Sequence, residues 1–97
     1  MTLAFSEAAV DDLIRLRRFI AEYNPEAAQR IARRLVSAIR KLAHTPQIGW
    51  YIPELPGEIR EFVFGHYIVR YAVVPGQEES EGASVYILRI WHGKEKR

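Results

Sequence analysis

Hydrophobic positions in the first half of the chain recur at helical spacing. Ser6 provides an N-cap and Glu7 an acidic first turn, and the apolar residues that follow predict a helix from about Glu7 to Glu22. Asn24 is interpreted as the N-cap of a second helix and Pro25 as its first helical residue, so this helix is expected to begin directly after the first. The two helices are predicted to form a hairpin.

The two predicted helices distribute their apolar residues differently. At about 100° per residue, the second helix has one apolar half and one basic half, and the basic half is expected to face solvent. Apolar side chains of the first helix cover an arc of about 220° at the same spacing, which exceeds a single interface. We expect part of this arc to stay exposed for a partner, with contacts at Leu16, Phe19 and Tyr23.

The second half of the chain has the pattern of a small sheet. Prolines and glycines break residues 46–57 into turns, and runs rich in Val, Ile, Tyr and Phe then predict strands at 59–64, 67–74 and 84–91. Residues 3–5 are a short fourth strand. The chain is therefore expected to be one α+β domain over residues 1–97, ordered β-αα-βββ, with the helical hairpin packed on one face of a small antiparallel sheet.

The apolar alternation within these strands also predicts which way two arginines point. Phe62, Leu88 and Ile90 are interpreted as the residues that face the helices. Arg60 and Arg89 are accordingly predicted to face away from them.

Composition narrows the class of protein. With 97 residues, 48% hydrophobic and 27% charged, the chain is expected to fold. It has no cysteine, which excludes disulfides, thiolate zinc sites and a cysteine nucleophile and fits a reducing compartment. An early acidic residue argues against a signal peptide, and no apolar run reaches membrane-spanning length. Cytoplasm, without membrane contact, is the expected location.

Charge is unevenly distributed around a formal net value of +2. Residues 1–44 carry eight Lys and Arg against five Asp and Glu, and residues 89–97 carry four against one. The net value alone is too small to indicate a nucleic-acid-binding protein. The acidic stretch Glu78, Glu79 and Glu81 is interpreted as a solvated hairpin tip.

The sequence offers few candidates for chemistry. Metal-ligand spacing, a Ser/His/Asp order and a glycine-rich phosphate loop are all missing, so no metal and no cofactor are expected. One polar set on the predicted sheet has the groups that metal-free RNA cleavage needs, namely an acid, a base and cations. The alternative is that the set marks the open face of a half-buried sheet. Its members are Arg60, Glu61, His66, Arg70, Arg89, His92 and Lys94.

A series of short motifs gives the chain a family resemblance. They are Pro46 to Gly49, Pro53-Glu54-Leu55, Ile59-Arg60-Glu61, Gly65 to Tyr71 and Val85 to Gly93. In this order, after a helical hairpin, they resemble the RelE/ParE superfamily of type II toxins. The resemblance implies a β-αα-βββ fold and a cognate antitoxin whose C-terminal segment wraps the toxin, for which Leu16, Phe19 and Tyr23 are the expected contacts. Operator DNA would be reached only indirectly, through the antitoxin.

The superfamily divides into two activities, and motif details favour one of them. RelE-like members cut messenger RNA on the ribosome, commonly with an arginine where this chain has Ile68 and with lysines on the preceding strand that it lacks. The Pro-Glu-Leu turn and the ending His92-Gly93 look more like ParE, whose members inhibit DNA gyrase by binding. We expect a non-catalytic ParE-like toxin. Its expected target-binding residues are Arg60, Arg89, Trp91, His92 and Lys94.

Two alternatives stay open at this point. One is a ribosome-dependent endoribonuclease, acting on the ribosome and messenger RNA, with its acid, base and charge-stabilising roles shared among Arg60, His66, Arg70, Arg89 and His92. The other is a toxin-fold remnant that only binds the antitoxin and helps it to repress its operon.

Overall fold

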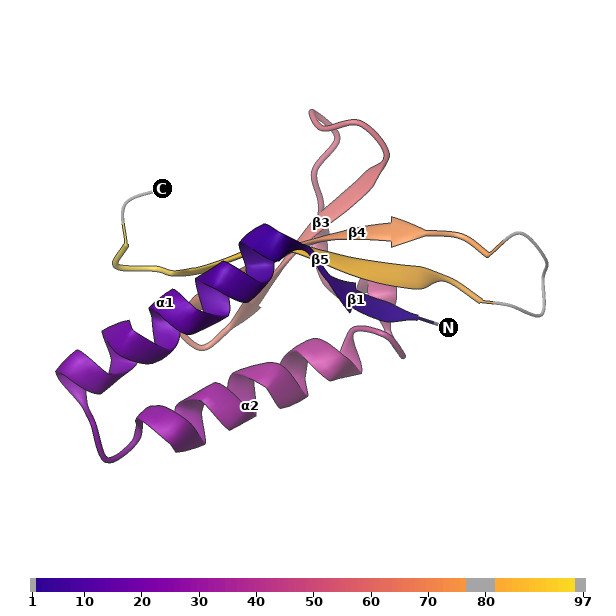
Figure 1. Ribbon diagram of the computed structural model, residues 1–97. Helices are drawn as coiled ribbons and strands as arrows, with labels where there is room; N and C mark the ends of the chain where they lie inside the picture. Colours follow the sequence, from indigo (N-terminus) through magenta and orange to yellow (C-terminus); the bar gives the residue numbers. More distant parts are fainter. Residues whose placement is uncertain (1, 77–81, 96–97) are drawn as a thin grey trace.

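Two helices lie against one face of a sheet that has five strands among the described residues (Figure 1). The structure is a computed structural model and describes residues 2–76 and 82–95, so the predicted acidic hairpin tip at Glu78 to Glu81 lies outside the described residues. The elements are β1 (Leu3–Phe5), α1 (Glu7–Tyr23), α2 (Ala28–Lys41), a 3₁₀ turn η1 (Pro46–Ile48), β2 (Trp50–Tyr51), β3 (Glu58–Phe64), β4 (Tyr67–Val74) and β5 (Ser84–His92).

The helix ends follow the predicted caps except at one point. Ser6 Oγ accepts the Ala9 N–H at 3.0 Å at the start of α1. At the hairpin, Asn24 Oδ1 accepts the Ala27 N–H at 3.2 Å and caps a turn instead of a helix. As a result α2 begins at Ala28 and not at Pro25, as the sequence had suggested.

The strands run in the order β1-β5-β4-β3-β2, with β1 parallel to β5 and the other neighbours antiparallel. The predicted α+β class and the position of the hairpin on one face are confirmed. The structure adds β2, a two-residue edge strand that pairs Trp50 with Glu61 and was not predicted. Two residues flanked by prolines and glycines carry too little pattern to be identified as a strand.

Strict alternation on β4 separates the two faces of the sheet. Tyr67, Val69, Tyr71 and Val73 are buried against the helices, whereas the residues between them are less covered. On the other side of the core, α1 contributes Leu16 and Ile20 and α2 contributes Leu35, Ile39 and Leu42. This single apolar layer holds the hairpin on the sheet.

A β-bulge sets the direction of Arg89. The register shifts so that Tyr71 is opposite Ile87 and Arg70 is opposite Arg89, which leaves Leu88 without a partner residue. The bulge lets Ile87 and Ile90 both face the helices, because it resets the alternation between them. Arg89 stays out of the core between helices and sheet, with a side chain that is 43% exposed, but it does not turn away from the helices, because its guanidinium binds Asp12 on α1.

The corresponding prediction for Arg60 is wrong. Arg60 is opposite the buried Tyr71 and therefore lies on the helix side of the sheet. Residues two apart on a strand share a face, so Phe62 and Arg60 have to point the same way. At this end of β3 the 3₁₀ turn replaces the helices as the cover, and Arg60 Nη1 donates to the Gly49 carbonyl at 2.8 Å.

A buried carboxylate joins α1 to the unpaired edge of β5. β1 pairs with β5 only at residues 85–87, and no other described strand lies along this edge of β5. Beyond β1, Asp12 supplies the hydrogen-bond acceptor that a neighbouring strand would have supplied. Asp12 Oδ2 accepts the Ile90 N–H at 2.8 Å and the Arg89 Nε–H at 2.8 Å, and its other oxygen binds Arg15. The side chain of Asp12 is only 3% exposed. Burial alone would raise the pKa of Asp12, but these hydrogen bonds outweigh it and lower the pKa.

Arg15 and Glu95 continue the same edge. Arg15 Nη2 donates to the Ile90 carbonyl at 3.0 Å, and Arg15 Nε donates to Glu95 Oε2 at 2.8 Å. Glu95 Oε1 in turn accepts the His92 N–H at 2.7 Å. Side chains thus satisfy the backbone groups that an edge strand would otherwise leave open to pairing.

Asp12→Asn should destabilise the fold strongly. The substitution keeps the shape of the side chain but removes the charge that two arginines share, so we expect a loss of about 2–4 kcal/mol in unfolding free energy at pH 7. The exposed neighbour Asp11→Asn is the control and should change it by less than about 0.5 kcal/mol. Chemical denaturation measures both.

The effect of Asp12→Asn should also depend on pH. Because the folded-state pKa of Asp12 lies below its ordinary value of 3.8, its stabilisation is present above that value and is lost as the pH falls through the lower, folded value. The stability difference between wild type and Asp12→Asn should shrink toward zero in strong acid. A difference that persists there would contradict the assigned role of the charge.

Candidate functional site

An aromatic groove lies where the end of α1 meets the start of β4 and the end of β5. It has a volume of about 210 Å³. Helix and sheet residues that are far apart in the sequence come together in its walls, and more than half of them carry aromatic rings. The lining residues, which define the aromatic groove, are Phe19, Ile20, Tyr23, Asn24, Ile31, His66, Tyr67, His92 and Lys94.

His92 forms the centre of the ring contacts in this groove. Its ring centroid lies 5.0 Å from that of Phe19, 5.1 Å from that of Tyr67 in an edge arrangement and 5.7 Å from that of His66. Phe19 in turn packs on Tyr23 at 4.9 Å. Tilted and edge-on pairs of this kind are favourable for aromatic rings. They hold His92 as a wall of the groove.

The two ring nitrogens of His92 have assigned roles. Nδ1 accepts the Lys94 backbone N–H at 3.1 Å, so the proton of the neutral ring sits on Nε2. Burial, and next the nearby His66, lower the pKa of His92 below its ordinary value of 6.5. His92 is therefore neutral at pH 7 and its lone pair is already engaged.

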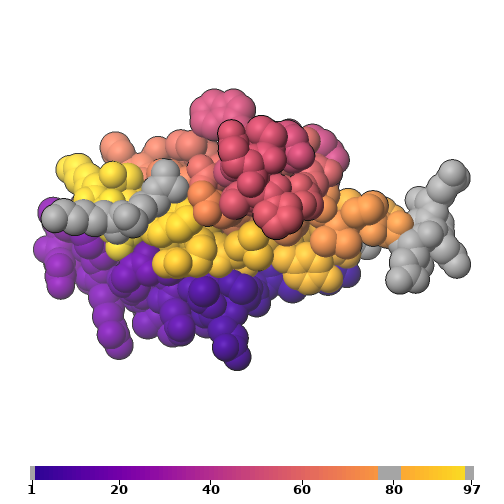
Figure 2. All heavy atoms as spheres, turned by 90° about the horizontal axis from the view of Figure 1, so that it is seen from above, coloured from indigo at the N-terminus to yellow at the C-terminus, as the bar shows by residue number. Residues whose placement is uncertain are grey.

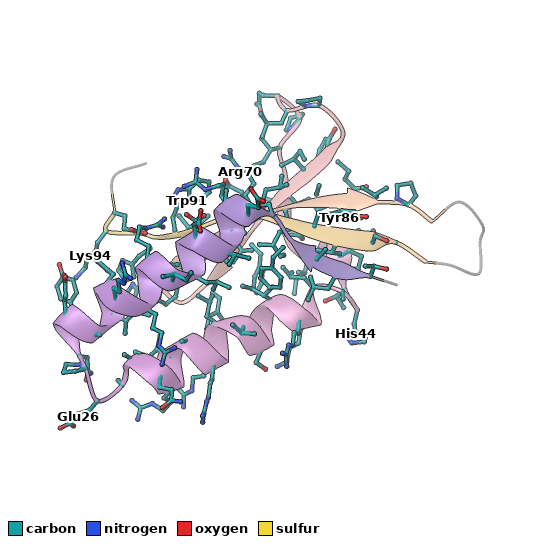
Figure 3. All side chains as sticks on the ribbon, viewed as in Figure 1. Glu26, His44, Arg70, Tyr86, Trp91 and Lys94 are labelled. Carbon is teal, nitrogen blue, oxygen red and sulfur yellow. The ribbon has the colours of Figure 1, made fainter. Side chains whose placement is uncertain are left out.

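The open face of the sheet carries cations that are paired within the molecule. Arg70 Nη2 lies 2.7 Å from Glu61 Oε2, and Arg89 Nε lies 2.8 Å from Asp12 Oδ2. The guanidinium carbons of both arginines lie 5.2 Å from the ring centroid of Trp91, which is 8% exposed. Figure 3 labels Arg70 and Trp91 on this side of the sheet. In the space-filling view, β5 in yellow separates α1 in indigo from the pink and orange of β3 and β4 (Figure 2).

Arg60 lies apart from both groups. Its Nε donates to Glu58 Oε2 at 2.8 Å, and its guanidinium carbon lies 5.8 Å from the Tyr51 ring centroid, at the β2 edge. Arg60 and the aromatic groove are on different parts of the sheet. The structure therefore does not gather the polar set that the sequence suggested into one site.

The residues predicted to contact a partner do not all lie at one surface. Phe19, Tyr23, His92 and Lys94 all line the aromatic groove. Leu16, predicted as a partner contact, is 1% exposed and belongs to the core, because the helical arc that it shares with Ile20 packs on the sheet. It is not a surface residue, and we do not assign it a contact.

Sequence reasoning missed the two residues that organise these surfaces. Tyr67 was assigned only to a strand, and no local signal places its ring beside Phe19. Asp12 had a usable signal, since it lies three residues after the buried Ala9 and four before the buried Leu16, on the core stripe of α1. A charge at such a position needs a buried partner.

Within the described ranges, no group of three or more His, Cys, Asp or Glu side chains is placed to hold a metal ion. None of the helices in this part of the chain is both long and apolar enough to cross a membrane.

Known proteins are similar to this chain along most of their length. The family model described as ParE toxin of the type II toxin-antitoxin system, parDE, matches residues 3–97. The curated Toxin RelE1 of Caulobacter vibrioides is 34% identical, covering 99% of this chain and 97% of the relative. Toxin RelE2 of the same organism is 36% identical, covering 87% and 85%.

A solved structure, described as the chromosomal ParDE TA system from P. aeruginosa, has the same fold with a TM-score of 0.73 at 22% identity, covering 95% of both chains. The fold and the motifs thus define a type II toxin of the RelE/ParE superfamily. Within that superfamily, the chain belongs to the ParE toxin family.

The protonation state of His92 can be measured directly. Nuclear magnetic resonance titration should give a pKa below 6.5 and a neutral Nε2–H ring at pH 7, because burial disfavours the charged form. Phe19→Ala opens the ring to water and should move the pKa back toward 6.5. A pKa above 6.5 in the wild type would contradict this geometry.

Proposed function

We propose that this toxin acts by binding DNA gyrase, without catalysis of its own, and that an antitoxin segment neutralises it at the aromatic groove. One observation supports the absence of catalysis. Each arginine of the suspected nuclease set on the sheet strands is paired with a carboxylate of the same molecule. Arg60 pairs with Glu58, Arg70 with Glu61 and Arg89 with Asp12.

RNA cleavage would require groups that this arrangement has already engaged. A general base needs a vacant lone pair, and the pentavalent phosphorus needs cations that are not already neutralised. His92 Nδ1 accepts a backbone N–H, and the three sheet arginines hold carboxylates. These contacts support a binding protein over a nuclease.

The nuclease remains the second candidate because of two findings. Both curated relatives described above are named RelE toxins. In addition, His66 and His92 lie side by side with Lys94 in the aromatic groove, which would give a nuclease two titratable rings and an ammonium group. For this candidate Lys94 and His92 would have to release their present contact on binding RNA.

Gyrase is the target that the ParE resemblance implies, and the family match supports it. A binding inhibitor needs no assembled catalytic group, only a rigid surface of fixed shape. The ion pairs on the sheet supply such rigidity, since each holds its guanidinium in one position.

The aromatic groove is the surface that fits an antitoxin best. The similar solved structure is described as a ParDE system, in which toxin and antitoxin occur together. Phe19 and Tyr23 line the groove from α1, and Tyr23 is 71% exposed. An apolar antitoxin side chain placed between these rings would bury them from water, and central aromatic residues of this kind dominate interface energies.

Phe19→Ala and Tyr23→Ala should each weaken antitoxin binding at least tenfold, about 1.4 kcal/mol. Ile14→Ala is the matched control, since Ile14 is 51% exposed on the same helix but does not line the groove. Isothermal titration calorimetry, with circular dichroism to confirm folding, would measure all three. Equal affinity for the groove variants and the control would remove the antitoxin from this site.

Gyrase inhibition and RNA cleavage should be assayed side by side with the purified toxin. We expect inhibition of gyrase supercoiling and no cutting of messenger RNA on the ribosome. Ribosome-dependent cleavage that His92→Ala reduces by roughly 10²–10⁴-fold would establish the nuclease instead.

A further inference from the structure

The exposed side of the helical hairpin carries arginines that have no ion-pair partner in the part of the chain that the structure describes. α2 contains no Asp or Glu between Ala28 and Lys41. Nitrogen-tipped side chains project from α2 on the side away from the sheet (Figure 3). Within residues 2–76 and 82–95, none of these cations makes an ion pair or a side-chain hydrogen bond. They are Arg17 and Arg18 on α1 and Arg30, Arg33, Arg34, Arg40 and Lys41 on α2.

This surface differs in kind from the sheet. The arginines that contact the sheet, Arg15, Arg60, Arg70 and Arg89, each hold a carboxylate. The hairpin cations instead repel one another, and like charges at helical spacings of three and four residues cost about 0.2–0.5 kcal/mol per pair. The stability of the helix therefore does not account for them.

The helix dipole accounts for only part of the positive charge on α2. Cations stabilise the last turn of a helix, where Arg40 and Lys41 lie. Arg30 lies in the first turn, where the dipole disfavours a positive charge, and Arg33 and Arg34 lie in the second turn, where it gives them no support. An external anion would relieve both costs.

The α2 cations fall into two rows. At about 100° per residue, Arg33 and Arg40 lie on one side of Ser37, and a second row lies on the other side. That second row is Arg30, Arg34 and Lys41. The first row borders an open groove of about 410 Å³, whose opposite wall includes Arg17 on α1.

Two cationic rows on one exposed helix match the two phosphate backbones of a major groove. The major groove of B-DNA is about 12 Å wide and admits a helix, whereas that of duplex RNA is too narrow. Single strands are usually held by stacking on aromatic rings, and the lining of this groove has none. Arginine is also the side chain best shaped for phosphate.

We propose that the outer face of α2 binds the phosphate backbones of duplex DNA, with one row on each strand. The contact is largely independent of base sequence, because most of the residues on the face are backbone-binding arginines. It is separate from the aromatic groove, so the toxin can hold DNA directly, in addition to any contact made through an antitoxin. This inference does not depend on the gyrase proposal.

Fluorescence anisotropy with the full chain and a labelled DNA duplex of about 20 base pairs, or two turns, tests the proposal. Titrations at about 50 to 200 mM NaCl should give a log–log salt slope of about −4 to −5, for five phosphate contacts. Arg33→Gln with Arg40→Gln, and Arg30→Gln with Arg34→Gln, should each weaken binding at least tenfold and reduce the slope by about 2.

Arg18→Gln is the charge-matched control for the single variant Arg33→Gln. Arg18 is exposed on α1 and lines neither the α2 rows nor the groove beside them. Its loss should leave the slope unchanged, while Arg33→Gln reduces it by about 0.9. Glutamine is a good helix former, so circular dichroism should show intact folding for every variant.

Four outcomes would overturn the proposal. They are no duplex DNA binding at the lowest salt, equal effects of Arg18→Gln and Arg33→Gln, tighter binding of duplex RNA or single strands than of duplex DNA, and equally effective competition by polyglutamate. The last would indicate an acidic polypeptide as the partner of this surface.

Discussion

The buried Asp12 carboxylate is the contact on which the rest of the molecule depends. It binds the Ile90 N–H at the open edge of β5 and holds arginines from both α1 and the sheet. A buried charge with all its hydrogen bonds made costs little, whereas the same charge without partners would cost several kcal/mol. Asp12 therefore fixes the position of α1 along β5. The aromatic groove contains residues from the end of α1, so its geometry depends on how α1 is aligned with β5.

The same contact also decides which surfaces are available for function. Arg89 and Arg15 are used to satisfy Asp12 and Glu95, and Arg60 and Arg70 are paired with glutamates of β3. Arg60, Arg70 and Arg89, the arginines of the suspected nuclease set, thus make contacts within the fold. Two other surfaces of the described residues are an apolar groove at one end of the hairpin, which we propose for a polypeptide partner, and a cationic face on α2, which we propose for phosphate. Their separation allows the two kinds of partner to bind at once.

The sequence predicted the secondary structure well because local physics determines it. Helical periodicity, the Ser6 cap and the β-branched runs each depend on residues close together in the chain.

The predictions failed where segments that are distant in the sequence meet. Arg60 was placed on the wrong face, and the bulge at Leu88 was not recognised, since both depend on pairing with β4. Leu16 was interpreted as a surface residue because a wheel diagram of one helix does not show which flank the sheet will cover. Phe19 and Tyr23 were predicted to share a partner surface, whereas His92 was assigned separately to target binding. That His92 and Tyr67 lie beside the helix was not predicted.

The arginines of this protein fall into two classes, those that hold a carboxylate and those that face solvent, and their Nε–H groups report the difference directly. Arg15, Arg60, Arg70 and Arg89 all donate from Nε to a carboxylate, at 2.8–2.9 Å. The outward-facing arginines of the hairpin, Arg17, Arg18, Arg30, Arg33, Arg34 and Arg40, have no such acceptor among the described residues. In a nitrogen–proton correlation spectrum of the toxin, the four paired Nε–H signals should exchange slowly with water and persist at neutral pH. Those of Arg30, Arg33, Arg34 and Arg40 should exchange rapidly. Uniform exchange rates across both classes would contradict the account.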